Sequence, residues 1–84
     1  MSRAEVLMPW VVEALRELGG KGSVVDVSKV VWRRHETDLE RLGDLFYTWQ
    51  YDLRWAAQRL RATGVLRPAT TRNAPWEIAG EGDR

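Results

Sequence analysis

Few side chains in this sequence have the chemistry that catalysis or metal binding requires. The 84 residues include one histidine, His35, and no cysteine, so a metal site built on imidazole or thiolate would lack its further ligands. No serine has a second histidine or a lysine arranged to activate it as a nucleophile. The glycines of residues 19–22 lack the spacing of a phosphate-binding Walker loop. We therefore expect no enzyme, no cofactor, no metal site and no small-molecule substrate, and we expect His35 to lie on the surface near a helix end.

Side chains suited to binding are concentrated in residues 41–76. This segment holds six arginines against two aspartates, a local charge of +4, although the net charge of the whole chain is only +1. Arginine can hold phosphate groups or the O6 and N7 atoms of guanine, glutamine can pair with adenine, and tyrosine hydroxyls can bond phosphates. A local basic stripe matters more for phosphate binding than the total charge does. The pattern favours double-stranded DNA as the partner.

A helical apolar stripe must position these side chains. Apolar residues, Trp49 among them, recur at spacings of 4, 4, 3 and 4 between Leu45 and Leu60. This spacing predicts a helix that buries the stripe and ends at Thr63-Gly64. The side opposite the stripe then faces outward. The candidate DNA-binding residues on this helix are Tyr47, Gln50, Tyr51, Arg54, Gln58 and Arg61.

A first helix is predicted by the apolar residues that repeat at helical spacing up to Leu18, and Gly19-Gly20 is expected to end it. Ser2 and Glu5 form a capping-box pattern that would start it early. That start would place Pro9 inside the helix, so we expect the helix to begin near Met8 instead.

A short strand over residues 21–23 and a second helix over residues 24–34 are expected next. Valines are frequent here and suit strands, but their spacing is helical, and Ser23 with Asp26 matches a helix N-cap. Residues 35–47 are expected to be a connector, with a short helical turn between Thr37 and Gly43.

The C-terminal part is expected to form a hairpin from strands 65–67 and 76–78, with a polar loop after Pro68. The predicted fold class is α+β, mostly helical: a winged helix-turn-helix with three main helices, a short strand and a C-terminal two-stranded wing hairpin. We expect a single domain over residues 1–84, with its core at about 6–79 and a frayed tail at 80–84. Further DNA-binding candidates are Arg33 and Arg34 at the end of the second helix and Thr70, Thr71, Arg72 and Asn73 at the wing tip.

The order and spacing of several motifs resemble the N-terminal domain of Mrr-type restriction endonucleases. The matching residues are Leu18-Gly19-Gly20, Trp55-Ala56, Leu60, Thr63-Gly64-Val65-Leu66, Trp76 and Ile78. The resemblance covers roughly residues 6–82 and implies a winged-helix DNA-recognition module, without the nuclease domain to which that module is tethered in the family. The matching residues are mostly scaffold, so they imply the fold more than a binding site. Residues 35–47 and Ala79 depart from the family pattern.

The expected function is DNA binding, with the third helix in the major groove and the wing on the backbone. The chain would then act as a small regulator, for example of transcription, or as the recognition module of a restriction-type system. No apolar run approaches the length of a membrane span and no signal-peptide pattern opens the chain, so we expect no membrane partner and a cytoplasmic location.

The alternative is a protein-interaction or homodimerisation module. Tyr47, Tyr51 and Trp55 form an aromatic row along the third helix, and aromatic residues are enriched at protein interfaces. Trp55 is costly to leave in water, so we expect it to pack within the protein. Salt separates the two functions, since DNA binding weakens steeply as salt rises and an aromatic interface does not.

Overall fold

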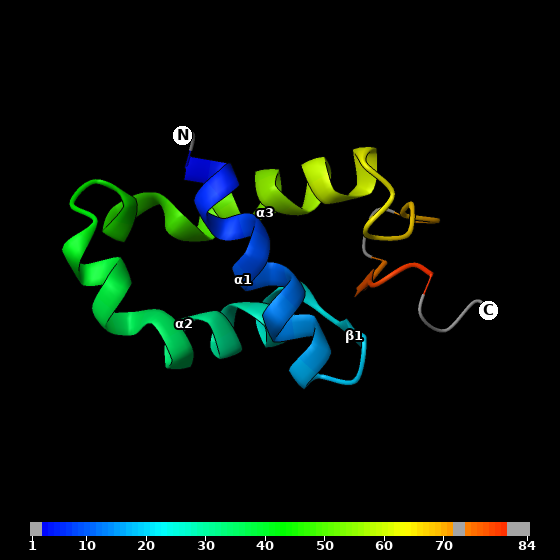
Figure 1. Cartoon of the computed structure of the whole chain (residues 1–84), viewed down its shortest axis with the longest axis horizontal. Helices are drawn as coiled ribbons and strands as arrows, with labels where there is room; N and C mark the ends of the chain where they lie inside the picture. The colour runs from blue at the N-terminus through cyan, green and yellow to red at the C-terminus, as the bar shows by residue number, and fades with distance from the viewer. Residues whose placement is uncertain (1–2, 72–73, 81–84) are drawn as a thin grey trace.

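Three helices and one small sheet make up the described part of the chain, residues 3–71 and 74–80, in a computed structural model (Figure 1). The elements follow in the order α1 (Arg3–Glu17), β1 (Lys21–Gly22), α2 (Val24–Arg41), α3 (Leu45–Ala62) and β2 (Trp76–Glu77). The expectation of an α+β, mostly helical chain is confirmed. None of the helices in these residues has the length and apolar character that crossing a membrane requires.

Helix α1 begins at Arg3, well before the expected start near Met8, and therefore contains Pro9. Proline inside a helix removes a backbone hydrogen bond and costs about 3 kcal/mol or more. The first turns stay helical because they pack into the core, where Ala4 and Leu7 are buried. The core thus reaches further toward the N-terminus than the expected residue 6, and tertiary burial outweighs the local preference.

Helix α2 starts as expected and ends later than expected. The Ser23 hydroxyl accepts a hydrogen bond of 3.1 Å from the backbone N–H of Asp26, which caps the first turn. The helix then continues beyond residue 34 to Arg41, through much of the expected connector, and bends at His35, whose backbone angles are non-helical (φ −125°, ψ 18°). Leu39 lies beyond the bend and is fully buried. The burial of Leu39 stabilises the helical conformation of residues 36–41.

The side chain of His35 is packed at the bend, so the expectation of a surface histidine near a helix end is wrong. Its ring stacks on Trp10 of α1, with centroids 4.0 Å apart and planes 6° from parallel. Nε2 of His35 lies 2.7 Å from Oε1 of Glu13, and Nδ1 lies 3.4 Å from Oδ2 of Asp38. The imidazole therefore joins the bend of α2 to α1.

Trp49, Leu53, Ala56 and Leu60 of the apolar stripe of α3 are buried in the core, as the spacing predicts. α3 packs chiefly against α1 and also contacts α2. Its start at Leu45 lies inside the expected connector, directly after a turn in which Gly43 has a positive φ of 57°. The helix ends at Ala62, one position before the expected Thr63-Gly64 stop. The buried residues are Ala4, Leu7, Val11, Ala14, Leu15, Val27, Val30, Val31, Leu39, Trp49, Leu53, Ala56, Ala57, Leu60, Leu66 and Trp76.

The small sheet differs from the expected hairpin in its pairing. β2 pairs antiparallel with β1, with Gly22 opposite Trp76, whereas residues 65–67 meet the returning segment through an antiparallel bridge between Leu66 and Ile78, outside the named strands. The N–H of Ile78 donates to the carbonyl of Gly20 at 2.8 Å, and the N–H of Arg67 donates to the carbonyl of residue 77 at 2.8 Å. The returning segment is therefore bonded on both sides. Pro68, which has no N–H, follows directly and limits the second pairing.

Replacement of Trp49 by alanine should destabilise the protein strongly. Only 6% of Trp49 is exposed, and its ring stacks on Trp32 with centroids 6.0 Å apart. Removing a buried aromatic side chain of this kind costs about 3–5 kcal/mol. Urea denaturation followed by circular dichroism measures the change, and Trp55→Ala is the matched control. Trp55 is 52% exposed, so its loss should cost about 1 kcal/mol or less, and equal losses for the two variants would contradict the orientation of α3.

Candidate functional site

The outward side of α3 carries two separate rows of side chains. A helix turns about 100° per residue, so residues 50, 54, 58 and 61 follow one line and residues 47, 51 and 55 follow another. The first row, which we call the polar row, consists of Gln50, Arg54, Gln58 and Arg61 and lines two pockets beside α2. The second, the aromatic row, consists of Tyr47, Tyr51 and Trp55 and lines neither of them. The structure thus divides the expected site on this helix into two surfaces.

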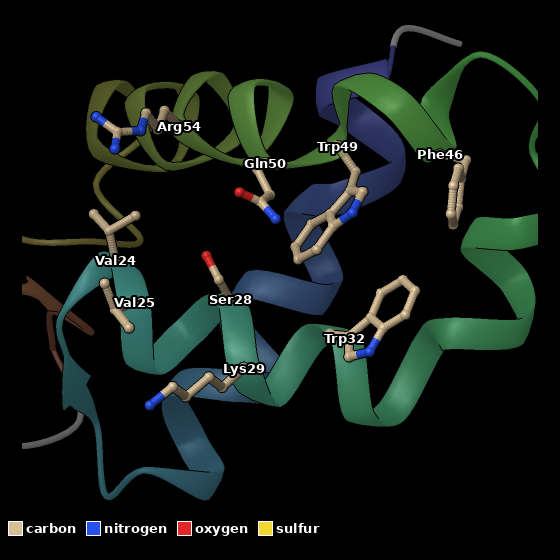
Figure 2. Close-up of a pocket in the computed structure, with 9 residues that line it drawn as sticks. All are labelled: Val24, Val25, Ser28, Lys29, Trp32, Phe46, Trp49, Gln50 and Arg54. Atoms are coloured by element: carbon tan, nitrogen blue, oxygen red, sulfur yellow. The ribbon is translucent and has the colours of Figure 1, made fainter.

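The first pocket lies between α2 and α3 and has a volume of about 630 Å³ (Figure 2). We call it the α2–α3 pocket. Its aromatic end is built by Trp32 of α2 together with Phe46 and Trp49 of α3. The ring of Trp32 is nearly parallel to that of Trp49, with 13° between the planes, and its centroid lies 6.2 Å from that of Phe46. These contacts hold the aromatic end in a defined shape.

The rest of the α2–α3 pocket combines polar and positively charged side chains with two apolar ones, Val24 and Val25, at the start of α2. Ser28 of α2 and Gln50 of α3 point toward each other across its middle, and the amine of Lys29 and the guanidinium of Arg54 lie toward the end away from Phe46 (Figure 2). Across the described residues, none of these four polar side chains has a hydrogen bond or ion pair within the protein. Their donors and acceptors are therefore available to a ligand.

The second pocket, about 410 Å³, lies between the start of α2, the later turns of α3 and the sheet. We call it the α2–sheet pocket. Arg54 lines it as well, so this one side chain belongs to both pockets. Arg61 is half-buried there, and its Nε is shielded from solvent without a hydrogen-bond partner in the described part of the chain. The remaining lining residues are Ser23, Val24, Val25, Gln58, Ala74 and Trp76.

No acidic side chain lines either pocket, in the part of the chain that the structure describes. The charged lining residues are Lys29, Arg54 and Arg61. The α2–sheet pocket also includes the first residues of α2, where the helix dipole presents a partial positive charge. Both hollows therefore favour anionic groups.

Other expected DNA-binding arginines lie elsewhere and are paired with acids. Arg33 and Arg34 of α2 both contact the carboxylate of Glu17 in α1, with 2.7 Å between Arg34 Nη2 and Glu17 Oε1. Glu13 adds a second acid at 3.6 Å from Arg34. These two arginines join α1 to α2 and do not line the pockets.

The basic segment that the sequence analysis singled out is also divided in space. Arg59 reaches Glu5 of α1 at 3.2 Å, and Nε of Arg67 lies 3.6 Å from a carboxylate oxygen of Glu77. Only Arg54 and Arg61 of the described arginines in this segment line the pockets. The local charge of +4 is therefore not presented as a single surface.

The expected contacts at the wing tip are described in part. Thr70 and Thr71 are exposed, and the carbonyl of Thr71 accepts a hydrogen bond of 3.2 Å from the N–H of Ala74. Arg72 and Asn73, the other two candidates there, lie outside the described residues. Two hydroxyl side chains thus remain available beyond the sheet.

The aromatic row is open to solvent. Tyr47 is 84% exposed and Tyr51 is 64% exposed. Trp55, expected to pack within the protein, is 52% exposed, and its ring contact is with Tyr51 at 6.4 Å between centroids. The expectation for Trp55 is wrong because its position on α3 turns the indole away from both α1 and α2.

Gln50 and Arg54 of the α2–α3 pocket were among the candidates, and its other lining residues were not: Val24, Val25, Ser28, Lys29, Trp32, Phe46 and Trp49. The sequence does contain a pattern that could have identified the pocket residues of α2. A second stripe recurs at helical spacing on a different side of α2 from the buried valines: Val25, Ser28, Lys29 and Trp32. The prediction of this helix depended on its buried stripe and not on the second one. Recognising the second stripe as part of a site requires knowing that it faces α3.

Comparisons with known proteins add nothing to this geometry: no protein-family model, no curated protein and no solved structure matches the chain. Within the described residues, no three side chains of the types histidine, cysteine, aspartate and glutamate are grouped so that they could hold a metal ion.

The pairing of Glu17 with two arginines should make stability depend on pH. Hydrogen bonding from Arg34 lowers the pKa of Glu17, partial desolvation opposes this effect, and the charge of Arg33 adds to the lowering. A lowered pKa in the folded state contributes stability at neutral pH, and that contribution is lost as the pH falls through the folded-state pKa. Glu17→Gln should therefore be less stable than the parent at neutral pH and equal to it in acid.

Urea denaturation at a series of pH values measures this difference. Glu36→Gln is the control, because Glu36 is exposed on α2 and has no ion pair among the residues described. A difference between Glu17→Gln and the parent that stayed constant across the whole pH range would contradict the ion-pair explanation.

Proposed function

We propose that the protein binds double-stranded DNA as a winged helix-turn-helix domain. In this arrangement α2 and α3 form the helix-turn-helix, and the polar row of α3 enters the major groove. The segment between residue 65 and β2 is the wing and lies on the DNA backbone. The resemblance to the N-terminal domain of Mrr-type restriction endonucleases supports the same proposal, with the chain serving as a recognition module or a small regulator.

This proposal depends on the absence of acidic side chains from the lining of the two pockets beside the polar row, among the residues that the structure describes. A duplex presents one negative charge per roughly 1.7 Å of its axis, so a surface that approaches it must be free of uncompensated carboxylates. The two pockets beside the polar row meet that condition in the described structure, and their charged side chains are Lys29, Arg54 and Arg61. The arginines on the α1 side of the molecule are instead neutralised by acids.

Each side chain of the polar row has a matching group in the duplex. Arg54 is exposed and can bond the O6 and N7 atoms of guanine with its two-pronged head. Gln50 and Gln58 are exposed as well and have the amide that pairs with the N6 and N7 atoms of adenine. In this proposal, Arg61 and Thr70 contact phosphates. The first turn of α2 adds the positive end of a helix dipole.

Double replacement of Arg54 and Arg61 by alanine tests the site. A bidentate contact to a base is worth about 1–3 kcal/mol, and a lost phosphate contact reduces the salt slope by about one. We therefore expect affinity for a random-sequence duplex to fall at least about tenfold, with a shallower salt dependence. Fluorescence anisotropy at several salt concentrations measures both quantities.

The matched control is the double variant Arg33→Ala with Arg34→Ala. It removes the same net charge from residues that pair with Glu17 on the α1 side, and it should weaken DNA binding much less. If both pairs of substitutions weakened DNA binding equally, the DNA would not bind specifically at the polar row. A parent protein that fails to bind the duplex even at low salt would refute the function.

Self-association through the aromatic row is a second candidate function. The three side chains are 84%, 64% and 52% exposed, which is unusual for neighbouring large aromatic residues. Tyr51 lies midway between Tyr47 and Trp55, so two antiparallel α3 helices would place Tyr51 against its own copy and Tyr47 against Trp55. A two-fold interface needs this self-complementary arrangement. We therefore name a second copy of this chain as the occupant.

Sedimentation of the parent and of Tyr51→Glu tests this candidate. The parent should form a concentration-dependent dimer that is nearly insensitive to salt, and the buried charge introduced by Tyr51→Glu should make it monomeric. Gln50→Glu, on the polar row of the same helix, is the control and should still dimerise. A parent that stays monomeric at high concentration removes the homodimer, and a dimer that survives Tyr51→Glu uses another surface.

A further inference from the structure

Contact with the major groove of a paired duplex does not by itself require a pocket as large as the α2–α3 pocket. Its volume of about 630 Å³ lies in the range of pockets that enclose small ligands, about 300–1,000 Å³. It also changes along its length, from an aromatic end through a neutral polar middle to an end where Lys29 and Arg54 lie on either side of Val24 and Val25 (Figure 2). A ligand that fits this order has a flat apolar ring, hydrogen-bonding groups on the ring edge and a negative charge at the far side.

We propose that the α2–α3 pocket binds one nucleotide whose base is not paired. An unpaired nucleotide can come from a distorted or unpaired position in bound DNA. In that case the proposal rests on the DNA-binding function proposed above and adds a site for one base to it. The same chemistry is shared by a free mononucleotide. The test below separates these two sources.

The aromatic end provides a surface for the base. Trp32 is half-buried and Phe46 is 36% exposed, so both keep ring surface that a base can cover. Trp49, only 6% exposed, also lines the pocket and stacks nearly parallel to Trp32 on the side toward Gln50 (Figure 2). Aromatic side chains bind bases of any sequence because each base has a π face. The contact of Trp32 with two other rings fixes its plane before the base arrives.

The middle of the pocket can read the base edge. The Gln50 amide supplies one acceptor and two N–H donors, and the Ser28 hydroxyl both donates and accepts. The two groups come from opposite helices, point toward each other and have no other hydrogen bond in the described residues (Figure 2). A base edge also alternates donors and acceptors, so it can satisfy both groups. A purely apolar ligand would leave both of them buried and unpaired.

The cationic end can hold the phosphate. Lys29 of α2 and Arg54 of α3 have no ion-pair partner within the residues described, and no carboxylate lines the pocket among those residues. Arginine binds phosphate through two parallel N–H bonds, and lysine binds it as a point charge. The two cations come from different helices and lie on opposite sides of this end, so either of them can meet a phosphate there (Figure 2).

Two binding measurements on the full chain test the proposal. The first titrates each of the four deoxynucleoside monophosphates by calorimetry. The second compares, by anisotropy, a duplex that has one unpaired base with the same duplex fully paired. Binding of a monophosphate indicates the free source, and tighter binding of the duplex with the unpaired base indicates the DNA source. If the parent binds no monophosphate and does not prefer the unpaired base, the nucleotide pocket is overturned. Binding of the fully paired duplex is measured separately and tests the proposed DNA-binding function.

Trp32→Leu and Trp55→Leu form the matched pair of variants. Both exchange a tryptophan for leucine, but Trp32 lines the pocket and Trp55 lies on the aromatic row. Trp32→Leu should weaken binding of the monophosphate, or the preference for the unpaired base, at least about fivefold. It should leave affinity for the fully paired duplex unchanged, and Trp55→Leu should change none of these values.

A second variant keeps the test valid if Trp32→Leu folds poorly. Lys29→Glu changes an exposed residue at the cationic end, and Lys21→Glu makes the same charge change on β1, away from the pocket. Lys29→Glu should abolish binding of the monophosphate, or the preference for the unpaired base, whereas Lys21→Glu should preserve it. Equal effects of the two substitutions would overturn the pocket as the binding site.

Discussion

The burial of one face of α3 against α1 is the contact on which the rest of this structure depends. Leu53 and Ala56 of α3 are completely buried, as are Leu7 and Val11 of α1. A chain of 84 residues buries a smaller fraction of its surface than a larger domain does, so each of these contacts matters for its stability. Because a helix is rigid about its own axis, fixing one face toward α1 also fixes the direction of every other side chain on α3. The polar row and the aromatic row are thus consequences of core packing.

Helix α2 is joined to α1 by ion pairs as well as by apolar contacts. Its first half buries Val27 and Val31 and is joined to α1 by the arginines that meet Glu17. Its second half depends on Leu39 and on the ring of His35 against Trp10. Exposed ion pairs contribute little to stability one at a time, so the apolar contacts carry most of the energy that sets the angle of α2. That angle leaves the space between α2 and α3 in which the larger pocket lies.

Local pattern was sufficient for the features of this fold that depend on one helix alone. The stripe of α3 and the cap of α2 at Ser23 follow from spacing and side-chain chemistry, and both agree with the structure. The early start of α1 could not be read in this way, because Pro9 argues against it and only the burial of Ala4 and Leu7 overrides that argument. The pairing of β2 with β1 is likewise a long-range choice that a local hairpin pattern does not contain.

The candidate site shows the same division. The residues of the polar row follow from the helical period of α3, but half of the α2–α3 pocket comes from α2, and its angle to α3 is a tertiary property. Arg33 and Arg34 illustrate the opposite error, since their sequence pattern suggests a basic patch and their neighbours in space are acids. Charge counted along the chain is therefore a weaker guide than charge counted within a hollow of the folded protein.

The position of Arg54 in both pockets has a thermodynamic consequence. One guanidinium cannot take its best position in the α2–α3 pocket and in the α2–sheet pocket at the same time. Any anion that draws it toward one pocket changes the free energy of binding at the other, and the reverse change must be equal in size. The two hollows are therefore coupled by a single rotatable side chain, and this coupling needs no movement of the backbone.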